Sequence, residues 1–487
     1  MDHRHRRTDP VRSPFGEGPG RRLPHRSFGQ RSSARDSEHD RQSTEEEEIH
    51  MVRMMPQAHS SASKKRRRKN KKKKLALVLA GGGITGAMYE IGALQALDRA
   101  FAGQFSVTDF DIIIGLSAGA FVGSLLANGV APAEMFFALD EQSRHLDALS
   151  QWDIYYPNLP ELVLKPLSFP LKLLQRGLHD LFHPGEFDIH AYLDSLDEML
   201  PSGLFTNERI EAYLRRTLGR DGRTNDFRRL DRHLYIVATD LDTGQRVIFG
   251  EEPHRDVPIS KAVQASTALP LLYKPVMING REFIDGAIRK SLHIDIALER
   301  GADLVICINP LVPLYNDWRE RMIPLLSGRG HHLSQKGMAS IAHQVMRIMV
   351  HSRISSGYEK YRHLYPDVDI LLIEPRREDR EMFFYKTMNY SARVSIARHG
   401  YEETLEALLK HFDHFEHYLR RHDIRLSRSI IRSGLMRVKR VPPNSYDEIK
   451  RLLYPTTEPT RTVDKLNAAL DILEEHLSSP ETEKRLA

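Results

Sequence analysis

Two apolar runs, each ending in a glycine-rich turn, constrain the fold of this chain more than any other feature. One run covers residues 75–80 and leads into GGGITG, and the other covers residues 111–114 and leads into GLSAG. Runs of this length in which nearly every residue is apolar are typical of strands buried on both faces, as in parallel sheets covered by helices. Similar runs at 234–239, 283–285, 304–308 and 368–373 extend the pattern. The sequence therefore predicts an α/β fold with a mostly parallel sheet.

The composition changes along the chain and divides it into three parts. Residues 1–74 are polar and charged, and we expect a disordered basic tail there. Residues 75–400 are expected to form one domain, with its motifs between residues 75 and 310. Within it, the apolar but proline-broken residues 150–205 predict either a lid or an insertion that packs on the core. Residues 401–487 are expected to form a helical C-terminal extension.

Two helical patterns allow more than one interpretation. Residues 418–440 set apolar side chains among arginines, which fits a peripheral membrane contact but is better explained by a helical cap with a solvated face. Apolar residues between Ile341 and Met349 recur at helical spacing, which predicts the core-facing side of a helix.

The charge distribution and the cysteine content indicate where in the cell the protein acts. The run KKRRRKNKKKK, from Lys64 to Lys74, holds ten cations, and removing them from the net charge of +6 leaves −4. Such a run can bind an anionic membrane surface, and a nucleic-acid partner is the less favoured interpretation. The single cysteine, Cys307, excludes an intrachain disulfide, and no segment has the composition of a signal peptide or a membrane span. We expect a cytoplasmic protein with peripheral membrane association.

Ser117 is the predicted nucleophile. It lies between an apparent strand and an apolar helix at residues 118–127, with Gly115 and Gly119 two residues away on either side. This is the pattern of a nucleophile elbow, in which glycines permit a sharp turn and the serine is exposed at the helix N-terminus.

The first glycine segment is predicted to form the oxyanion hole. Gly81, Gly82, Gly83 and Gly86 can present backbone N–H groups to an anion without obstruction by side chains. The same spacing also satisfies the dinucleotide-binding fingerprint of a Rossmann fold. No carboxylate ends a second strand as that fold requires, and the second strand leads directly to Ser117, so the oxyanion interpretation is favoured.

Asp285 is the predicted general base. It ends an apparent strand and is followed by Gly286 and Ala287. A carboxylate at the end of a strand can reach a serine at the same end of a neighbouring strand, and we expect burial to raise its pKa.

Together, GGGITG after a strand, GLSAG, and ASTALPLLYKPVMINGREFIDGA resemble the patatin-like phospholipase family. The resemblance implies a three-layer α/β/α fold, a Ser117–Asp285 dyad, and a lipid ester as substrate, with no metal or cofactor. Two positions depart from the family pattern: Thr85 replaces a frequent Arg or Lys, and Arg289-Lys290-Ser291 replaces a frequent asparagine. Neither departure removes a residue of the dyad.

The sequence thus predicts a serine ester hydrolase that forms an acyl-enzyme. Two alternatives stay open: a Rossmann dinucleotide-binding protein, and a non-catalytic membrane-binding scaffold on a lipase fold. A Ser–His–Asp triad is a further rival, because His293 follows Asp285 by eight residues. The sequence does not define the lipid ester, the acyl acceptor or the oligomeric state.

Overall fold

Alternate residues of the central strands face two separate hydrophobic cores. In β1 (Leu75–Leu79), Leu77 and Leu79 pack into one core, and Ala76 and Val78 pack into the other. This period of two is what a strand buried on both faces requires. The computed structural model describes residues 73–138, 146–167, 174–175, 200–289, 292–385, 387–442 and 445–453, all within one compact unit.

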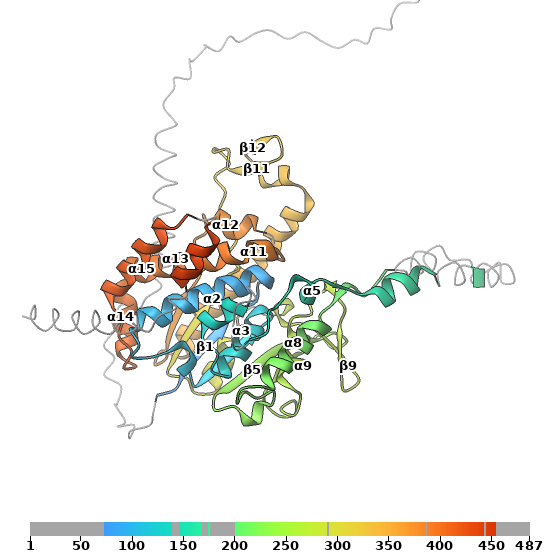
Figure 1. Ribbon diagram of the computed structural model, residues 1–487, viewed down its shortest axis with the longest axis horizontal. Helices are drawn as coiled ribbons and strands as arrows, with labels where there is room; N and C mark the ends of the chain where they lie inside the picture. The colour runs from blue at the N-terminus through green and yellow to red at the C-terminus, as the bar shows by residue number, and fades with distance from the viewer. Residues whose placement is uncertain are drawn as a thin grey trace, which may run out of the picture. The chain divides into compact units, whose positions relative to one another are not determined.

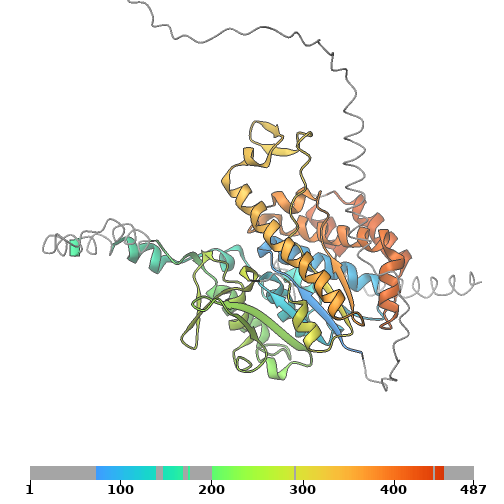
Figure 2. The same ribbon diagram turned by 180° about the vertical axis from the view of Figure 1, so that it is seen from behind.

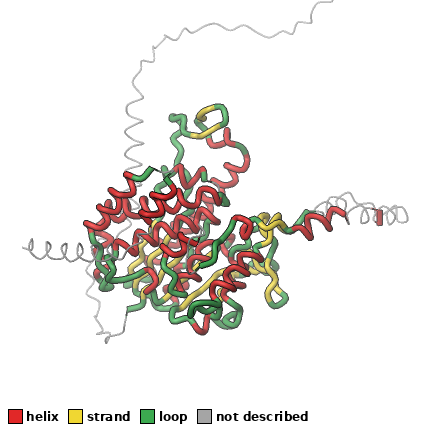
Figure 3. The backbone as a smooth tube through the Cα atoms, in the orientation of Figure 1, coloured by secondary structure: helices red, strands yellow, loops and turns green. Residues whose placement is uncertain are grey.

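The main sheet has the strand order β13-β10-β1-β2-β5-β9-β8, and β6 pairs with β5. Figures 1 and 3 show strands of this sheet lying among the helices. The strands from β13 to β5 are parallel, whereas β6, β9 and β8 are antiparallel to their partners. The predicted mostly parallel sheet is confirmed. Its strands are β2 (Ile112–Leu116), β5 (His233–Asp240), β6 (Arg246–Phe249), β8 (Val276–Ile278), β9 (Arg281–Asp285), β10 (Leu304–Ile308) and β13 (Asp369–Ile373).

Helices cover both faces, which confirms the predicted three-layer α/β/α arrangement. The larger core includes residues of α2 (Gly83–Ala100), α3 (Ala118–Ala127), α8 (Glu208–Leu218), α9 (Ile259–Ser266) and α13 (Arg393–Lys410). The other core includes residues of α10 (Ile294–Glu299) and α11 (Met338–Leu364), and Figure 2 shows α11, in yellow-orange, crossing its face of the sheet.

Shorter elements complete the described chain. Two small sheets are formed by β3 (Tyr156–Pro157), β4 (Gly203–Thr206) and β7 (Leu271–Tyr273), and by the hairpin of β11 (Ile323–Leu325) and β12 (Gly328–Gly330). The remaining helices are α4 (Pro132–Ala138), α5 (Gln151–Ile154), α12 (Arg380–Phe384), α14 (Phe412–Arg420), α15 (Arg428–Arg440) and α16 (Tyr446–Leu453). The 3₁₀ turns are η1 (Val107–Asp109), η3 (Phe227–Arg229), η4 (Gly286–Ile288), η5 (Leu333–Lys336) and η6 (Tyr390–Ala392).

Helix α13 runs across residue 400, where the sequence predicts the end of the main domain. It packs closely along α2. A Cβ at Gly400 would lie 2.4 Å from the carbonyl oxygen of Tyr89, and one at Gly92 would lie 2.0 Å from that of Ala397. Backbones this close require glycine at both positions. The helices after residue 400 therefore continue the core layer, which local pattern could not indicate because α2 is some 300 residues away in sequence.

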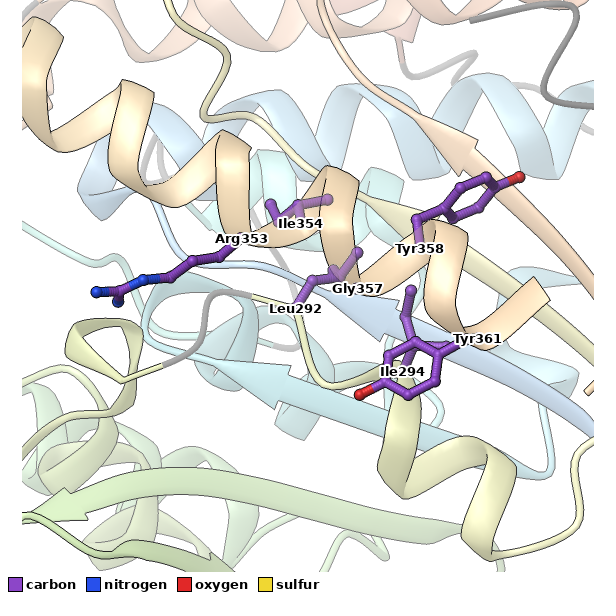
Figure 4. A pocket seen from close by; sticks show the side chains of 7 residues that line it. All are labelled: Leu292, Ile294, Arg353, Ile354, Gly357, Tyr358 and Tyr361. Atoms are coloured by element: carbon purple, nitrogen blue, oxygen red, sulfur yellow. The ribbon is translucent and has the colours of Figure 1, made fainter. Parts of the chain in front are cut away.

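Helix α11 differs from the expectation. Of the apolar residues predicted to face the core, Met346 is half-buried and the other four are exposed, from 43% for Ile341 to 51% for Met349. Only the C-terminal half of α11 packs on the sheet. There the helix packs on Leu292 and Ile294 through Ile354, Tyr358 and Tyr361. These side chains leave a cavity of about 10 Å³, which has room for roughly one water molecule (Figure 4).

The remaining predictions on organisation fall partly outside the described residues. These include the basic tail up to residue 72, most of residues 168–199 and the chain after residue 453. In the described part of the 150–205 segment, Trp152, Leu164 and Leu167 are each more than 60% exposed. A lid role for this segment stays a prediction. Within the described ranges no single helix is long and apolar enough to cross a membrane; α3 and α4 meet that test only together, bent by 119°.

Candidate active site

Ser117 occupies a strained turn between β2 and α3. Its φ of 53° and ψ of −121° lie outside the regions that residues with a Cβ prefer, at a cost of about 1–3 kcal/mol. The side chain is buried and makes no capping hydrogen bond to α3. The hydroxyl is therefore not used to stabilise the helix that begins beside it.

Glycines at both ends of the turn let three backbone segments meet. A Cβ at Gly115 would lie 2.5 Å from the carbonyl oxygen of Gly119. A Cβ at Gly119 would lie 2.6 Å from the carbonyl oxygens of Leu79 and Ala80. The Gly119 N–H donates to the Ala80 oxygen at 3.2 Å, so the turn is held against the end of β1, where the glycine loop begins.

The register of β5 brings Asp285 to Ser117. Strand β2 ends where Leu116 pairs with Val237, and the next residue of β5, Ala238, pairs with Asp285. Because β6 occupies the other edge of β5, β2 and β9 follow one another along the same edge. The two strands run in opposite directions and meet end to end. The expected convergence is present, but β9 is not a neighbour of β2 within the sheet.

The hydroxyl of Ser117 lies beside the carboxylate of Asp285, and the Ala287 N–H donates to Asp285 Oδ1 at 2.8 Å. Asp285 is 1% exposed, and burial raises its pKa to about 6 although the Ser117 hydroxyl and the Ala287 N–H favour the ionised form. Gly286 is required beside it, since a Cβ there would lie 2.6 Å from Leu116 Cδ1. The carboxylate is thus held in contact with the serine and poised to gain or lose a proton near neutral pH.

The glycine loop lies directly on Ser117. A Cβ at Gly81 would lie 2.8 Å from the Ser117 Cβ and 3.4 Å from its Oγ. Among the described residues, the N–H groups of Gly82, Gly83 and Ala118 have no protein acceptor. These amides lie at the starts of α2 and α3, where helix dipoles favour negative charge; Ala118 directly follows the nucleophile, and Gly82 follows Gly81.

Gly86 differs from the expectation for the loop. Helix α2 already begins at Gly83, and the Gly86 N–H donates to the Gly82 carbonyl oxygen at 2.9 Å. That amide is therefore not available to an oxyanion. Gly86 instead permits close packing, because a Cβ there would lie 3.2 Å from Pro310 Cγ and 3.4 Å from the Gly81 oxygen.

Two residues that the sequence did not single out support the site. The Ser266 hydroxyl accepts from the Ser117 N–H at 2.8 Å and donates to the Val237 oxygen at 2.7 Å, so it holds the strained turn to β5. The backbone oxygen of Thr387 accepts a hydrogen bond from the Thr85 N–H at 3.1 Å, and the side chain of Thr387 lies against Gly83. Ser266 lies within the run that carries the family resemblance, but only the fold shows its contact with Ser117.

The histidine considered as a rival base lies elsewhere. His293 Nδ1 is 3.4 Å from an Arg246 nitrogen and 3.9 Å from Asp295. Among the contacts of the described histidines, none reaches Ser117 or Asp285.

Known proteins resemble this chain. A sequence model of the patatin-like phospholipase family matches residues 77–298. A probable lipid hydrolase, 463L of Invertebrate iridescent virus 6, is 24% identical over 250 residues, which cover 49% of this chain and 70% of that protein.

Two solved structures also resemble it at low identity. VipD from Legionella pneumophila is 14% identical, with 86% of this chain and 96% of that chain covered and a TM-score of 0.27. The type III effector protein ExoU is 16% identical, with 82% and 78% covered and a TM-score of 0.22. The family match spans β1, the Ser117 turn and Asp285, so all three parts of the candidate site lie within the region that is similar to patatin-like phospholipases.

Proposed function

We propose that this protein is a lipid acyl hydrolase in which Ser117 and Asp285 act as a catalytic dyad. The observation that carries the proposal is the register of β5, which brings the Ser117 hydroxyl beside a buried carboxylate whose pKa is raised to about 6. A base is most effective when its pKa lies near the working pH. The family match and the viral lipid hydrolase support a lipid ester as the substrate class.

In the proposed reaction, Asp285 takes the Ser117 proton while Oγ attacks the ester carbonyl. The carbonyl oxygen gains negative charge, which the N–H groups of Gly82, Gly83 and Ala118 stabilise. Collapse of the tetrahedral intermediate expels the alcohol, which receives the proton from Asp285, and leaves an acyl group on Ser117. Water then attacks this ester with Asp285 again as base, releasing the fatty acid and the free serine.

The surroundings of the glycine loop favour this function over dinucleotide binding. A pyrophosphate would need open space above Gly81 and Gly83. Ser117 lies against Gly81, and Thr387 and Met388 lie against Gly83. A nucleophile at one end of the loop and a packed segment at the other suit a small oxyanion better than a phosphate pair.

A fluorophosphonate probe tests the proposal, because it reacts with an activated serine and remains attached. We expect mass spectrometry to locate the adduct on Ser117, with labelling lost in Asp285→Asn and kept in His293→Gln. Adduct on another residue, or dependence on His293, would refute the dyad. Wild-type protein that is neither labelled nor hydrolytic, but still binds lipid, would support the scaffold alternative.

A further inference from the structure

The N-terminal half of helix α11 packs on the protein through polar side chains and turns an apolar face outward. Residues 338, 341, 345 and 348 share one face by helical spacing, and Met338, Ile341, Val345 and Ile348 are between 43% and 85% exposed. A helix of a soluble protein normally has the opposite arrangement. The outward apolar face therefore requires an explanation other than folding.

The inward face is anchored by specific hydrogen bonds, so its orientation is well defined. Gln344 exchanges hydrogen bonds with the backbone of Leu314 at 3.0 and 2.7 Å. Arg347 is 1% exposed and donates to the carbonyl oxygens of Val312 and Met382 at 2.8 and 2.7 Å. Rotating the helix to bury its apolar face would break all four hydrogen bonds and leave a buried guanidinium unpaired.

The apolar face lies at the catalytic end of the molecule. Helix α11 leads into β13 at its C-terminus, so its N-terminal half projects past the carboxyl ends of the parallel strands, where the glycine loop and Ser117 also lie. Figure 1 shows the β11–β12 hairpin projecting beyond this half of the helix. The link to the loop is direct, since Thr387 Oγ1 lies 3.0 Å from His343 Nε2 and the Cγ2 of the same residue lies against Gly83.

Cations without acidic partners surround this face. Residues 321–353 contain five Arg or Lys and no Asp or Glu, and one of the five is the buried Arg347. Beside the hairpin, a hollow of about 340 Å³ is lined by Arg329, Arg380, Phe384 and Tyr385, with Glu381 also on its wall. Among the described residues neither Arg329 nor Arg380 forms an ion pair, whereas Glu381 pairs with His399.

Side chains suited to a lipid–water interface complete the surface. Leu326 at the hairpin tip is fully exposed, and Trp318 is 58% exposed beside His332. Tryptophan prefers the interfacial zone of a bilayer, where its ring is partly buried and its N–H stays hydrated.

We propose that the outward face of α11, the β11–β12 hairpin and the Arg329–Arg380 hollow form a docking surface for an anionic phospholipid bilayer. The apolar side chains enter the acyl region, and the two arginines bind a lipid phosphate in the hollow. This inference rests on the proposed lipid hydrolase function, because docking here brings the catalytic end of the sheet to an aggregated substrate.

Tryptophan fluorescence isolates this surface from the basic tail. The chain has two tryptophans, so Trp152→Phe leaves Trp318 as the only reporter. We expect brominated phosphatidylcholine, in vesicles that also contain phosphatidylserine, to quench Trp318. Unquenched Trp318 in protein that sediments with the vesicles would overturn the proposal, because the tail or another surface would then mediate binding.

Substitutions test the two parts of the surface in the full chain. Ile341→Ser, Val345→Ser and Ile348→Ser together should weaken vesicle binding about tenfold or more. Arg329→Gln with Arg380→Gln should weaken it about fivefold per arginine on phosphatidylserine vesicles, and little on phosphatidylcholine alone. Met436→Ser and Arg432→Gln on α15 are the matched controls, exposed on another helix, and should bind like wild type.

Hydrolysis of a water-soluble short-chain ester separates this inference from the proposed function. The α11 variants should keep that activity and lose hydrolysis of phospholipid in vesicles, whereas Ser117→Ala should lose both and still show quenched Trp318. Unchanged vesicle binding in the α11 variants would contradict the proposed docking surface without affecting the proposed hydrolase function. A dimer that the same substitutions convert to monomer, with Trp318 quenching unaffected, would instead identify a second copy as the occupant.

Discussion

The carboxylate of Asp285 lies beside the hydroxyl of Ser117, although the two residues lie at the ends of strands that run in opposite directions. The strand between them, β5, pairs with β2 and then with β9 along one edge. Both side chains therefore lie where the pairing of β5 changes from β2 to β9. Because Val237 and Ala238 are consecutive residues of β5, this register sets the separation of Ser117 and Asp285.

The first prediction concerns the base. Asp285→Asn should lower kcat for a p-nitrophenyl ester by about 10²–10⁴-fold, because the amide cannot accept the serine proton. Asp242→Asn, in the exposed turn after β5, is the matched control and should keep full activity. Circular dichroism would establish that both variants fold, and near-normal turnover in folded Asp285→Asn would contradict the dyad.

The pH dependence of activity should report the same carboxyl. Asp285 acts as a base only when ionised, and burial raises its pKa to about 6. We expect kcat/KM to rise about tenfold per pH unit below that value and to level off above it. A profile that stays flat from about pH 5 to about pH 7 would show that another group is the base.

Stability should change in the opposite direction to activity. The folded pKa of about 6 exceeds the ordinary value of 3.8, so the folded state binds the proton more tightly than the unfolded chain. Ionised Asp285 therefore destabilises the fold by about 3 kcal/mol above pH 6, less between the two pKa values, and not at all below the lower one. Asp285→Asn should gain stability at neutral pH, by up to that amount, in urea unfolding. A gain that does not shrink on acidification would contradict this origin.

Ser266 should prove to be a positioning residue. Ser266→Ala leaves the buried Ser117 N–H without an acceptor, which should cost about 1–3 kcal/mol and lower kcat by loosening the turn. Ser260→Ala is the comparison, since Ser260 is equally buried on α9 and hydrogen-bonds Glu211 instead. That variant should lose stability with kcat unchanged. Equal effects of both substitutions on kcat would mean that Ser266 acts only through stability.

The glycine loop should tolerate no side chain beside the nucleophile. Gly81→Ala places a Cβ 2.8 Å from that of Ser117, so the loop must shift away. Displacing oxyanion donors in this way should cost about 10²–10³-fold in kcat. Gly357→Ala on α11 meets only Tyr361, at 3.7 Å, and should be neutral or slightly stabilising. Full activity in Gly81→Ala would argue against the loop as oxyanion hole.

Much of the fold was predictable from local pattern. The buried strands, the apolar helix at Ala118–Ala127 and the turn at Ser117 follow from short runs whose period and glycines act over a few residues. The close packing of α13 on α2 was not predictable, because it depends on Gly92 and Gly400, which lie far apart in the sequence. The outward face of α11 was missed for a related reason: apolar periodicity shows that a helix has one apolar side, but not which side meets the protein.

The sequence alone was thus sufficient to identify a candidate serine, carboxylate and glycine loop, because each lies in a short motif whose glycines indicate a turn. Their meeting, the support from Ser266 and the engagement of the Gly86 amide in α2 depended on how β5 and the helices align. Those alignments arise from packing and hydrogen bonds between segments far apart in the chain, which leave no periodic trace in the sequence.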